Sequence, residues 1–176
     1  MATHDILHYP TPSLCEPARG LTTIDDEVQA LIEDMAETMY HSHGVGLAAP
    51  QVNFSRRIVT MDVEPDSSED TLVKIANPEI VERHGEIVWE EGCLSFPGIT
   101  AEVVRSAEVL VKGIGQDGEE FSFEVSGLGA VCIQHEVARD GVEGAGNGVL
   151  VRQAELGTSS LEVLEDQVNV CACSSS

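Results

Sequence analysis

The order of three sequence patterns constrains the fold of this chain more than any single residue does. A helical pattern covers residues 23–44, short β-rich runs follow from Arg56 to Ser126, and a second, apolar helical pattern covers residues 126–138. The last two β-rich runs are separated by Gln-Asp-Gly, which is typical of a hairpin turn. Strands that follow one another at short range between two helices predict an α+β domain.

The two helical segments carry their own signals. In the first, apolar residues recur at helical spacing, acidic residues follow Thr23, and His43 and Gly44 mark the end. This pattern predicts an amphipathic helix. In the second segment, the i, i+3, i+4, i+7 rule places four residues on one face, namely Leu128, Val131, Cys132 and His135.

Length and composition limit the class of protein. With 176 residues, 42% of them hydrophobic, the chain can bury one substantial core, so we expect one folded domain. The formal net charge of -22 makes nucleic acid and anionic membranes poor partners, and we interpret the acidity as a solvated surface. No segment has membrane-spanning length, and the N-terminus lacks the basic and apolar regions of a secretory signal. The five cysteines are odd in number and irregularly spaced, which favours reduced thiols and a cytoplasmic location.

Three short stretches carry residue types suited to catalysis. The segment GVGLAAPQ, residues 44–51, combines glycines that allow close backbone approach with Gln51, whose amide can donate to an oxyanion. The segment EGCLS, residues 91–95, resembles an exposed loop that carries the thiol of Cys93. The pair His135 and Glu136 begins a zinc-hydrolase pattern in which a second His follows one helical turn later. Each stretch alone is compatible with an ordinary loop, an inert thiol or a chance pair.

Taken together and in this order, the stretches resemble the peptide deformylases, whose signatures are GxGLAAxQ, EGCLS and HExxH. The resemblance runs from ILHYP near the N-terminus through CIQHE and includes MDV, NPEI and EEGCLS. It implies an α+β fold in which short antiparallel strands pack around a central helix bearing His135 and Glu136, with an N-terminal amphipathic helix. It also implies removal of the N-formyl group from the N-terminal methionine of nascent polypeptides.

The resemblance further implies one divalent metal ion, Fe²⁺ in this family, with Zn²⁺, Ni²⁺ or Co²⁺ as substitutes. Cys93 would be a thiolate ligand and His135 an imidazole ligand. Glu136 would serve as general base and acid beside the metal. Gln51 and the backbone N–H of Leu94 would donate hydrogen bonds to the oxyanion that forms from the formyl oxygen.

The same resemblance implies a peptide-binding site, and formyl-methionyl peptide N-termini are the expected partner. Four residues would line the pocket for the methionine side chain, namely Val45, Leu128, Val131 and Cys132. Gly46 would let the substrate backbone run alongside the loop as an added strand, and Glu91 with Arg105 would form a supporting ion pair. Because the chain is strongly acidic, we expect no docking to the ribosome through a basic tail.

The chain departs from the family pattern after Val137. Ala138 replaces the Asp of the family pattern, and Arg139 stands where the second His of HExxH belongs. Arginine cannot ligate a metal because its guanidinium stays protonated. Two ligands therefore remain where a catalytic site of this type uses three plus water, and we expect weak metal binding and little activity. The Arg139 side chain is predicted either to reach over the face of His135 toward the ion position or to point into solvent.

Three explanations for this departure stay open. The similarity stops after Glu136 or Val137 and a Gly- and Ser-rich sequence follows, which favours a frameshift. On that basis we divide the chain into a deformylase-like domain, residues 1–136, and a divergent, poorly specified segment, residues 137–176. The second explanation is a non-catalytic pseudoenzyme that binds an apolar peptide N-terminus without hydrolysing it. The third is a substitute ligand, for which the candidates are Asp140, Cys171 and Cys173. An HExxH protease is disfavoured because it would leave the other two motifs unexplained.

Overall fold

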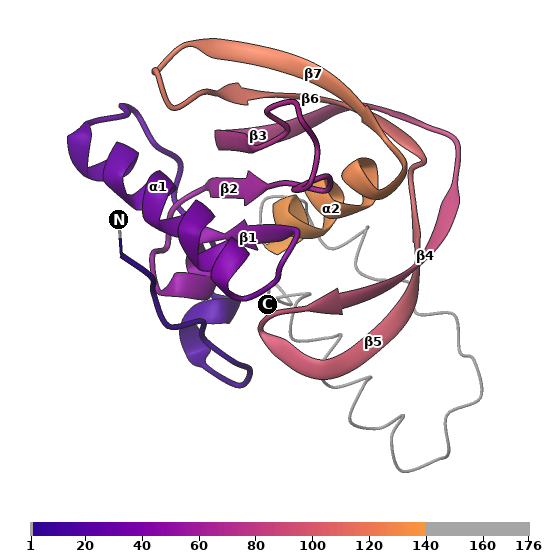
Figure 1. Ribbon diagram of the computed structural model, residues 1–176, viewed down its shortest axis with the longest axis horizontal. Helices are drawn as coiled ribbons and strands as arrows, with labels where there is room; N and C mark the ends of the chain where they lie inside the picture. The colour runs from indigo at the N-terminus through magenta and orange to yellow at the C-terminus, as the bar shows by residue number, and fades with distance from the viewer. Residues whose placement is uncertain (1, 140–176) are drawn as a thin grey trace, which may run out of the picture.

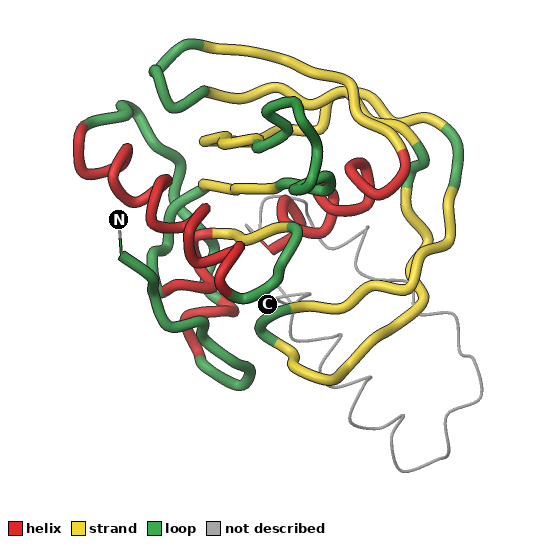
Figure 2. Tube along the Cα trace, viewed as in Figure 1, coloured by secondary structure: helices red, strands yellow, loops and turns green. Residues whose placement is uncertain are grey.

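The computed structural model describes residues 2–139, with the backbone alone for Cys15 and Arg139. In this part of the chain, five strands form an antiparallel sheet in the order β1-β2-β3-β6-β7, and β4 and β5 form a separate hairpin (Figure 1). The strands are β1 Gly46–Ala48, β2 Ile58–Met61, β3 Val73–His84, β4 Ile87–Cys93, β5 Phe96–Arg105, β6 Glu108–Ile114 and β7 Glu120–Ser126. The helices are α1 Asp26–His41 and α2 Gly127–Arg139, with two short 3₁₀ helices, η1 Pro12–Cys15 and η2 Ala49–Val52 (Figure 2). The predicted α+β arrangement is confirmed.

Helix α1 forms where the sequence pattern predicts it. Asp25 caps its N-terminus by accepting a hydrogen bond of 2.9 Å from the backbone N–H of Val28, and two acidic residues occupy the first turn. The helix ends because His43 adopts a positive φ of 55° and the N–H of Gly44 bonds the carbonyl of Met39 at 3.0 Å. Five residues of one face are buried, namely Ile32, Met35, Ala36, Thr38 and Met39. This end of α1 delivers the chain directly into β1.

Strand β2 is the centre of the molecule because helices cover both of its faces. Ile58 belongs to the cluster that packs with α1, whereas Val59 and Met61 belong to the cluster that packs with α2. Successive strand residues point to opposite faces, so this division follows from the strand geometry. Figure 1 shows α1 and α2 on opposite sides of β1 and β2. All four residues of β2 are buried.

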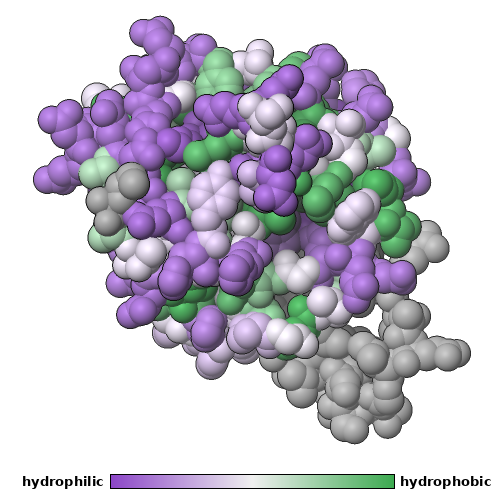
Figure 3. Space-filling model, in the orientation of Figure 1, coloured by the Kyte–Doolittle hydropathy of each residue, from purple (hydrophilic) through white to green (hydrophobic). Residues whose placement is uncertain are grey.

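The β4–β5 hairpin is inserted between β3 and β6, which pair with each other in the sheet. It therefore extends away from the sheet and faces the end of α2, as Figure 1 shows. Hydrophilic residues cover most of the face in Figure 3, with hydrophobic residues in smaller patches between them. None of the helices in residues 2–139 has the length and apolar character needed to cross a membrane.

Candidate active site and metal centre

The three sequence motifs meet at one cavity of about 460 Å³. β1 and the residues before it, the turn of the β4–β5 hairpin and one face of α2 line this cavity. All the predicted site residues line it except Arg105, which lies behind the wall. The face of α2 predicted to present Leu128, Val131, Cys132 and His135 is the face that lines the cavity.

The EGCLS segment is not the exposed loop that its sequence suggested. Glu91, Gly92 and Cys93 form the end of β4, and Ser95 is completely buried in the turn before β5. The side chain of Glu91 is only 7% exposed. Pairing of β4 with β5 and hydrogen bonds to residues far along the chain hold this segment in place, although Gly92 stays exposed, and local sequence does not reveal such contacts. Cys93 is thereby held at the end of a strand rather than on the exposed loop that was expected.

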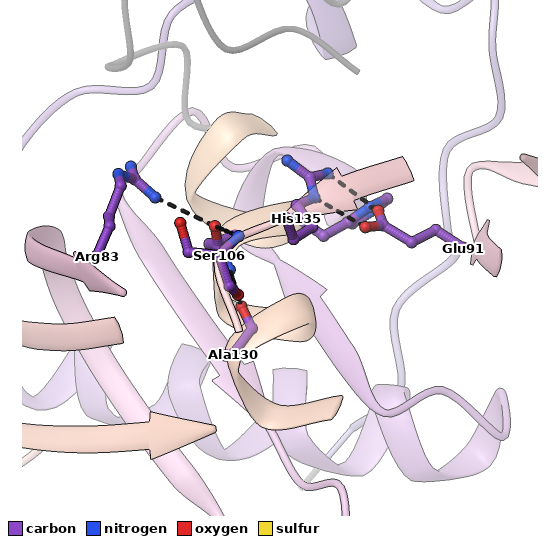
Figure 4. A network of polar contacts seen from close by, with 7 residues as sticks. Arg83, Glu91, Ser106, Ala130 and His135 are labelled. Carbon is purple, nitrogen blue, oxygen red and sulfur yellow. Dashed lines mark hydrogen bonds and ion pairs between the residues drawn. The ribbon is translucent and has the colours of Figure 1, made fainter. Parts of the chain in front are cut away.

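Glu91 links Arg105 to His135. Arg105 donates through Nε and Nη2 to the two carboxylate oxygens of Glu91, at 2.8 and 3.0 Å, and His135 Nδ1 lies 2.7 Å from Glu91 Oε2 (Figure 4). Burial raises the pKa of Glu91, but the bonds to Arg105 and His135 outweigh it and lower that pKa to about 2. Glu91 is therefore a permanent carboxylate that fixes the His135 ring. The predicted ion pair between Glu91 and Arg105 is present. The sequence did not predict that Glu91 also contacts His135.

His135 is surrounded by negative charge. Burial lowers its pKa, but the bonds to Cys93 and Glu91 and the charge of Glu136 outweigh burial and raise the pKa to about 9. Its Nδ1 is held by Glu91, so its Nε2 is the atom left for a ligand. No nitrogen or oxygen atom of the described residues hydrogen-bonds this buried Nε2.

Gln51 is fixed by three neighbours although it was expected only to donate to substrate. It is 1% exposed, and its Oε1 accepts a hydrogen bond of 2.9 Å from the backbone N–H of Ala48. Its Nε2 lies 3.1 Å from Ser95 Oγ and 3.7 Å from Cys93 Sγ. These contacts orient the amide N–H groups toward the hairpin side of the cavity, beside Leu94.

Gly46 allows β1 to approach α2 very closely. A Cβ atom at this position would lie 2.6 Å from Cys132 Sγ and 2.7 Å from Glu136 Oε1, so one of these side chains would have to shift. Cys132 Sγ donates to the carbonyl of Val45 at 3.4 Å, and burial, followed by the charge of Glu136, raises the pKa of this thiol well above its ordinary value. The glycine therefore brings the carboxylate of Glu136, which is 5% exposed, to the edge of β1.

Sequence reasoning missed two residues of this region. The amide of Gln134 exchanges two hydrogen bonds with the backbone of Ser106, at 3.0 and 2.9 Å, and also bonds Arg83 and the carbonyl of Ala130 (Figure 4). Gln134, the residue before His135, thereby anchors α2 beside the end of β5. Trp89 lines the cavity from β4, and only its unusual size within an otherwise acidic and aliphatic run could have indicated a role.

The residues present supply only part of a divalent metal site. The thiol of Cys93 and the buried Nε2 of His135 are suitable donors, since thiolate and imidazole bind Zn²⁺ and related ions. Within residues 2–139, however, no group of three or more His, Cys, Asp or Glu side chains could hold a metal. The backbone of α2 continues through Arg139, the position expected for a third ligand. These residues therefore do not fit a complete catalytic site, which needs three protein donors.

Four further expectations lie outside the described residues. They are the direction of the Arg139 side chain and the three candidate substitute ligands, Asp140, Cys171 and Cys173.

The chain matches a family model described as polypeptide deformylase over residues 3–145, which extends past the boundary expected at residue 136. It is 46% identical over 144 residues to a peptide deformylase of Syntrophobacter fumaroxidans, covering 82% of this chain and 84% of that protein. It is also 48% identical over 137 residues to a peptide deformylase of Chromobacterium violaceum, covering 78% of this chain and 81% of that protein.

Solved structures give the same result. The crystal structure of a peptide deformylase from Legionella pneumophila aligns with a TM-score of 0.78 and 39% identity, covering 96% of this chain and 94% of that one. The peptide deformylase of Thermotoga maritima aligns with a TM-score of 0.74 and 40% identity, covering 80% of this chain and 92% of that one. These alignments confirm the predicted fold. By sequence and by fold, the chain belongs to the polypeptide deformylase family.

Proposed function

We propose that the cavity between β1, the β4–β5 hairpin and α2 binds the N-formylmethionyl end of a nascent polypeptide. The observation that carries this proposal is the meeting of all three family motifs at one cavity. Among the described strands β1 pairs only with β2, so an extended peptide can lie against its other edge as an added strand. Leu128, Val131 and Cys132 provide an apolar wall for a methionine side chain.

The polar residues are assigned roles in amide hydrolysis. Gln51 and the backbone N–H of Leu94 donate hydrogen bonds to the formyl oxygen as it gains negative charge. Glu136 exchanges a proton with water and with the leaving amine, because its buried carboxylate lies beside the Gly46 edge where the formyl group would sit. Glu91 holds the His135 ring in place and is itself fixed by Arg105.

We also infer that this chain hydrolyses its substrate slowly. The family uses a divalent metal ion, for which Cys93 and His135 are the donors, and Fe²⁺, Zn²⁺ and Ni²⁺ are the candidates. With Arg139 at the third position, we expect the ion to bind weakly. A second function is non-catalytic binding of an apolar peptide N-terminus. The incomplete set of metal donors favours it, because the residues that form the apolar wall, Leu128, Val131 and Cys132, are not metal donors.

Metal content, turnover and peptide binding, measured on the same preparation, separate these functions. We expect much less than one metal ion per chain by mass spectrometry and little release of formate from formyl-Met-Ala-Ser. We also expect the peptide to change the fluorescence of Trp89, the one tryptophan of the chain, which lines the cavity. A formyl-Asp-Ala-Ser peptide is the control, because an acidic side chain does not fit the apolar wall.

Each outcome is informative. Nearly one metal ion per chain with rapid turnover would contradict the inferred impairment and indicate a substitute ligand. Absence of peptide binding would contradict both functions. Arg139→His should not restore full activity if the sequence that follows is out of frame, and resequencing the codons for residues 136–141 tests that explanation directly.

A further inference from the structure

Trp89 is a cavity residue to which the proposed function assigns no chemical role. It is 37% exposed although it is the largest side chain on the wall. Among residues 2–139, its side chain takes part in no ring–ring contact or hydrogen bond. Aromatic side chains left open on a concave wall are typical of ligand contacts, because they offer a large rigid surface.

The register of β4 directs Trp89 toward the site. Trp89 and Glu91 are two residues apart in a regular part of the strand, so they share a face. That face is the inner one, since Glu91 reaches His135 and the residue opposite Trp89, Val103, is only 2% exposed. Val88, on the other face, is 52% exposed. The indole therefore faces the cavity, whereas Val88 is not among the residues that line it.

The other wall suits an unbranched apolar side chain. Leu128, Val131 and Cys132 come from α2, whereas Trp89 comes from the hairpin, so the two apolar walls belong to different elements. A thioether beside an aromatic ring gains a favourable sulfur–aromatic contact, which a methylene group of the same size does not make.

We propose that Trp89 is a specificity-determining residue that selects the methionine thioether by a sulfur–aromatic contact. This inference rests on the proposed function, because it concerns the same peptide-binding cavity. It predicts that the protein binds a formyl-methionyl peptide about two- to tenfold more tightly than the same peptide with norleucine in place of methionine. Norleucine has the same length and replaces only the sulfur atom.

The test uses the full chain and two peptides, formyl-Met-Ala-Ser and formyl-Nle-Ala-Ser, each carrying fluorescein at the C-terminus. Fluorescence anisotropy gives both dissociation constants for the wild type, Trp89→Leu, Trp89→Phe and the control Val88→Ala. We expect Trp89→Leu to bind the two peptides equally and Trp89→Phe, which keeps a ring, to retain the preference for methionine. Val88→Ala should behave like the wild type, because its side chain lies on the outer face of β4.

Equal affinities of the wild type for the two peptides would overturn the inference, even if the Leu variant fails to fold. A methionine preference that persists in Trp89→Leu would also overturn it. In both cases the proposed function survives, since peptide binding itself is observed. If the wild type binds neither peptide, the proposed function fails and the inference fails with it.

Discussion

The buried contact between Arg105 and Glu91 makes the sharpest prediction about stability. Both side chains are 7% exposed and the contact is bidentate, with distances of 2.8 and 3.0 Å. Arg105→Met removes the cation but keeps the volume, and so leaves the Glu91 carboxylate buried with His135 as its remaining partner. Removing one partner of a buried ion pair costs about 3–5 kcal/mol, and we expect the lower end because His135 remains.

The lowered pKa of Glu91 corresponds to a free energy of similar magnitude. Its decrease from 4.5 to about 2 corresponds to a stabilisation of roughly 3 kcal/mol, shared between Arg105 and His135. Because the folded-state pKa is lower than the unfolded one, this stabilisation is present above pH 4.5 and is lost as the pH falls toward 2. In Arg105→Met the pKa of Glu91 rises, so the difference in stability between variant and wild type should shrink in acid.

Urea unfolding followed by circular dichroism, at pH 7 and pH 4, measures this difference. The matched control is Lys112→Met, which breaks the pair with Glu79 at 3.0 Å, whose side chains are 53% and 59% exposed. Exposed pairs contribute less than about 1 kcal/mol, so the control should stay close to the wild type. If Arg105→Met lost no more stability than Lys112→Met, the assigned role of the buried pair would be wrong.

Three other perturbations have clear expected outcomes. Gly46→Ala places a Cβ against Cys132 and Glu136, so we expect a loss of about 1–3 kcal/mol in urea unfolding and weaker peptide binding; unchanged binding would contradict the close approach of β1 to α2. Tyr40 donates a hydrogen bond of 2.6 Å to Asp62, and its partial burial together with this bond raises the pKa of Tyr40 to about 12. Because this folded-state pKa exceeds the unfolded value of about 10, the stabilisation is intact below pH 10 and is lost between pH 10 and 12. Urea midpoints at pH 8 and 11 should fall more for the wild type than for Tyr40→Phe, and equal changes would contradict the pairing. The net charge of -22 predicts that the thermal midpoint rises when sodium chloride is increased from 0.05 to 1 M, because salt screens repulsion; a constant midpoint would show that the acidic surface costs no stability.

The sequence by itself determined the local elements and the identity of the chemical groups. Apolar spacing located α1 and α2 to within a few residues, and end signals helped to bound α1, because helix formation depends on neighbours three and four positions apart. The turn residues after β6 located the last hairpin, with Gly118 at a positive φ of 85°. The three motifs identified the family, and the missing second His was visible in the sequence alone.

Only the tertiary structure decided how these groups meet. The position of EGCLS depends on the pairing of β4 with β5 and on Gln51, more than forty positions earlier in the chain. The contact of Glu91 with both Arg105 and His135 joins a strand to a helix, and no local pattern records that pairing. Trp89 faces the cavity because register, and not residue type, sets which face of β4 points inward. Such contacts arise from packing between distant segments, so their partners become known only when the elements are placed in space.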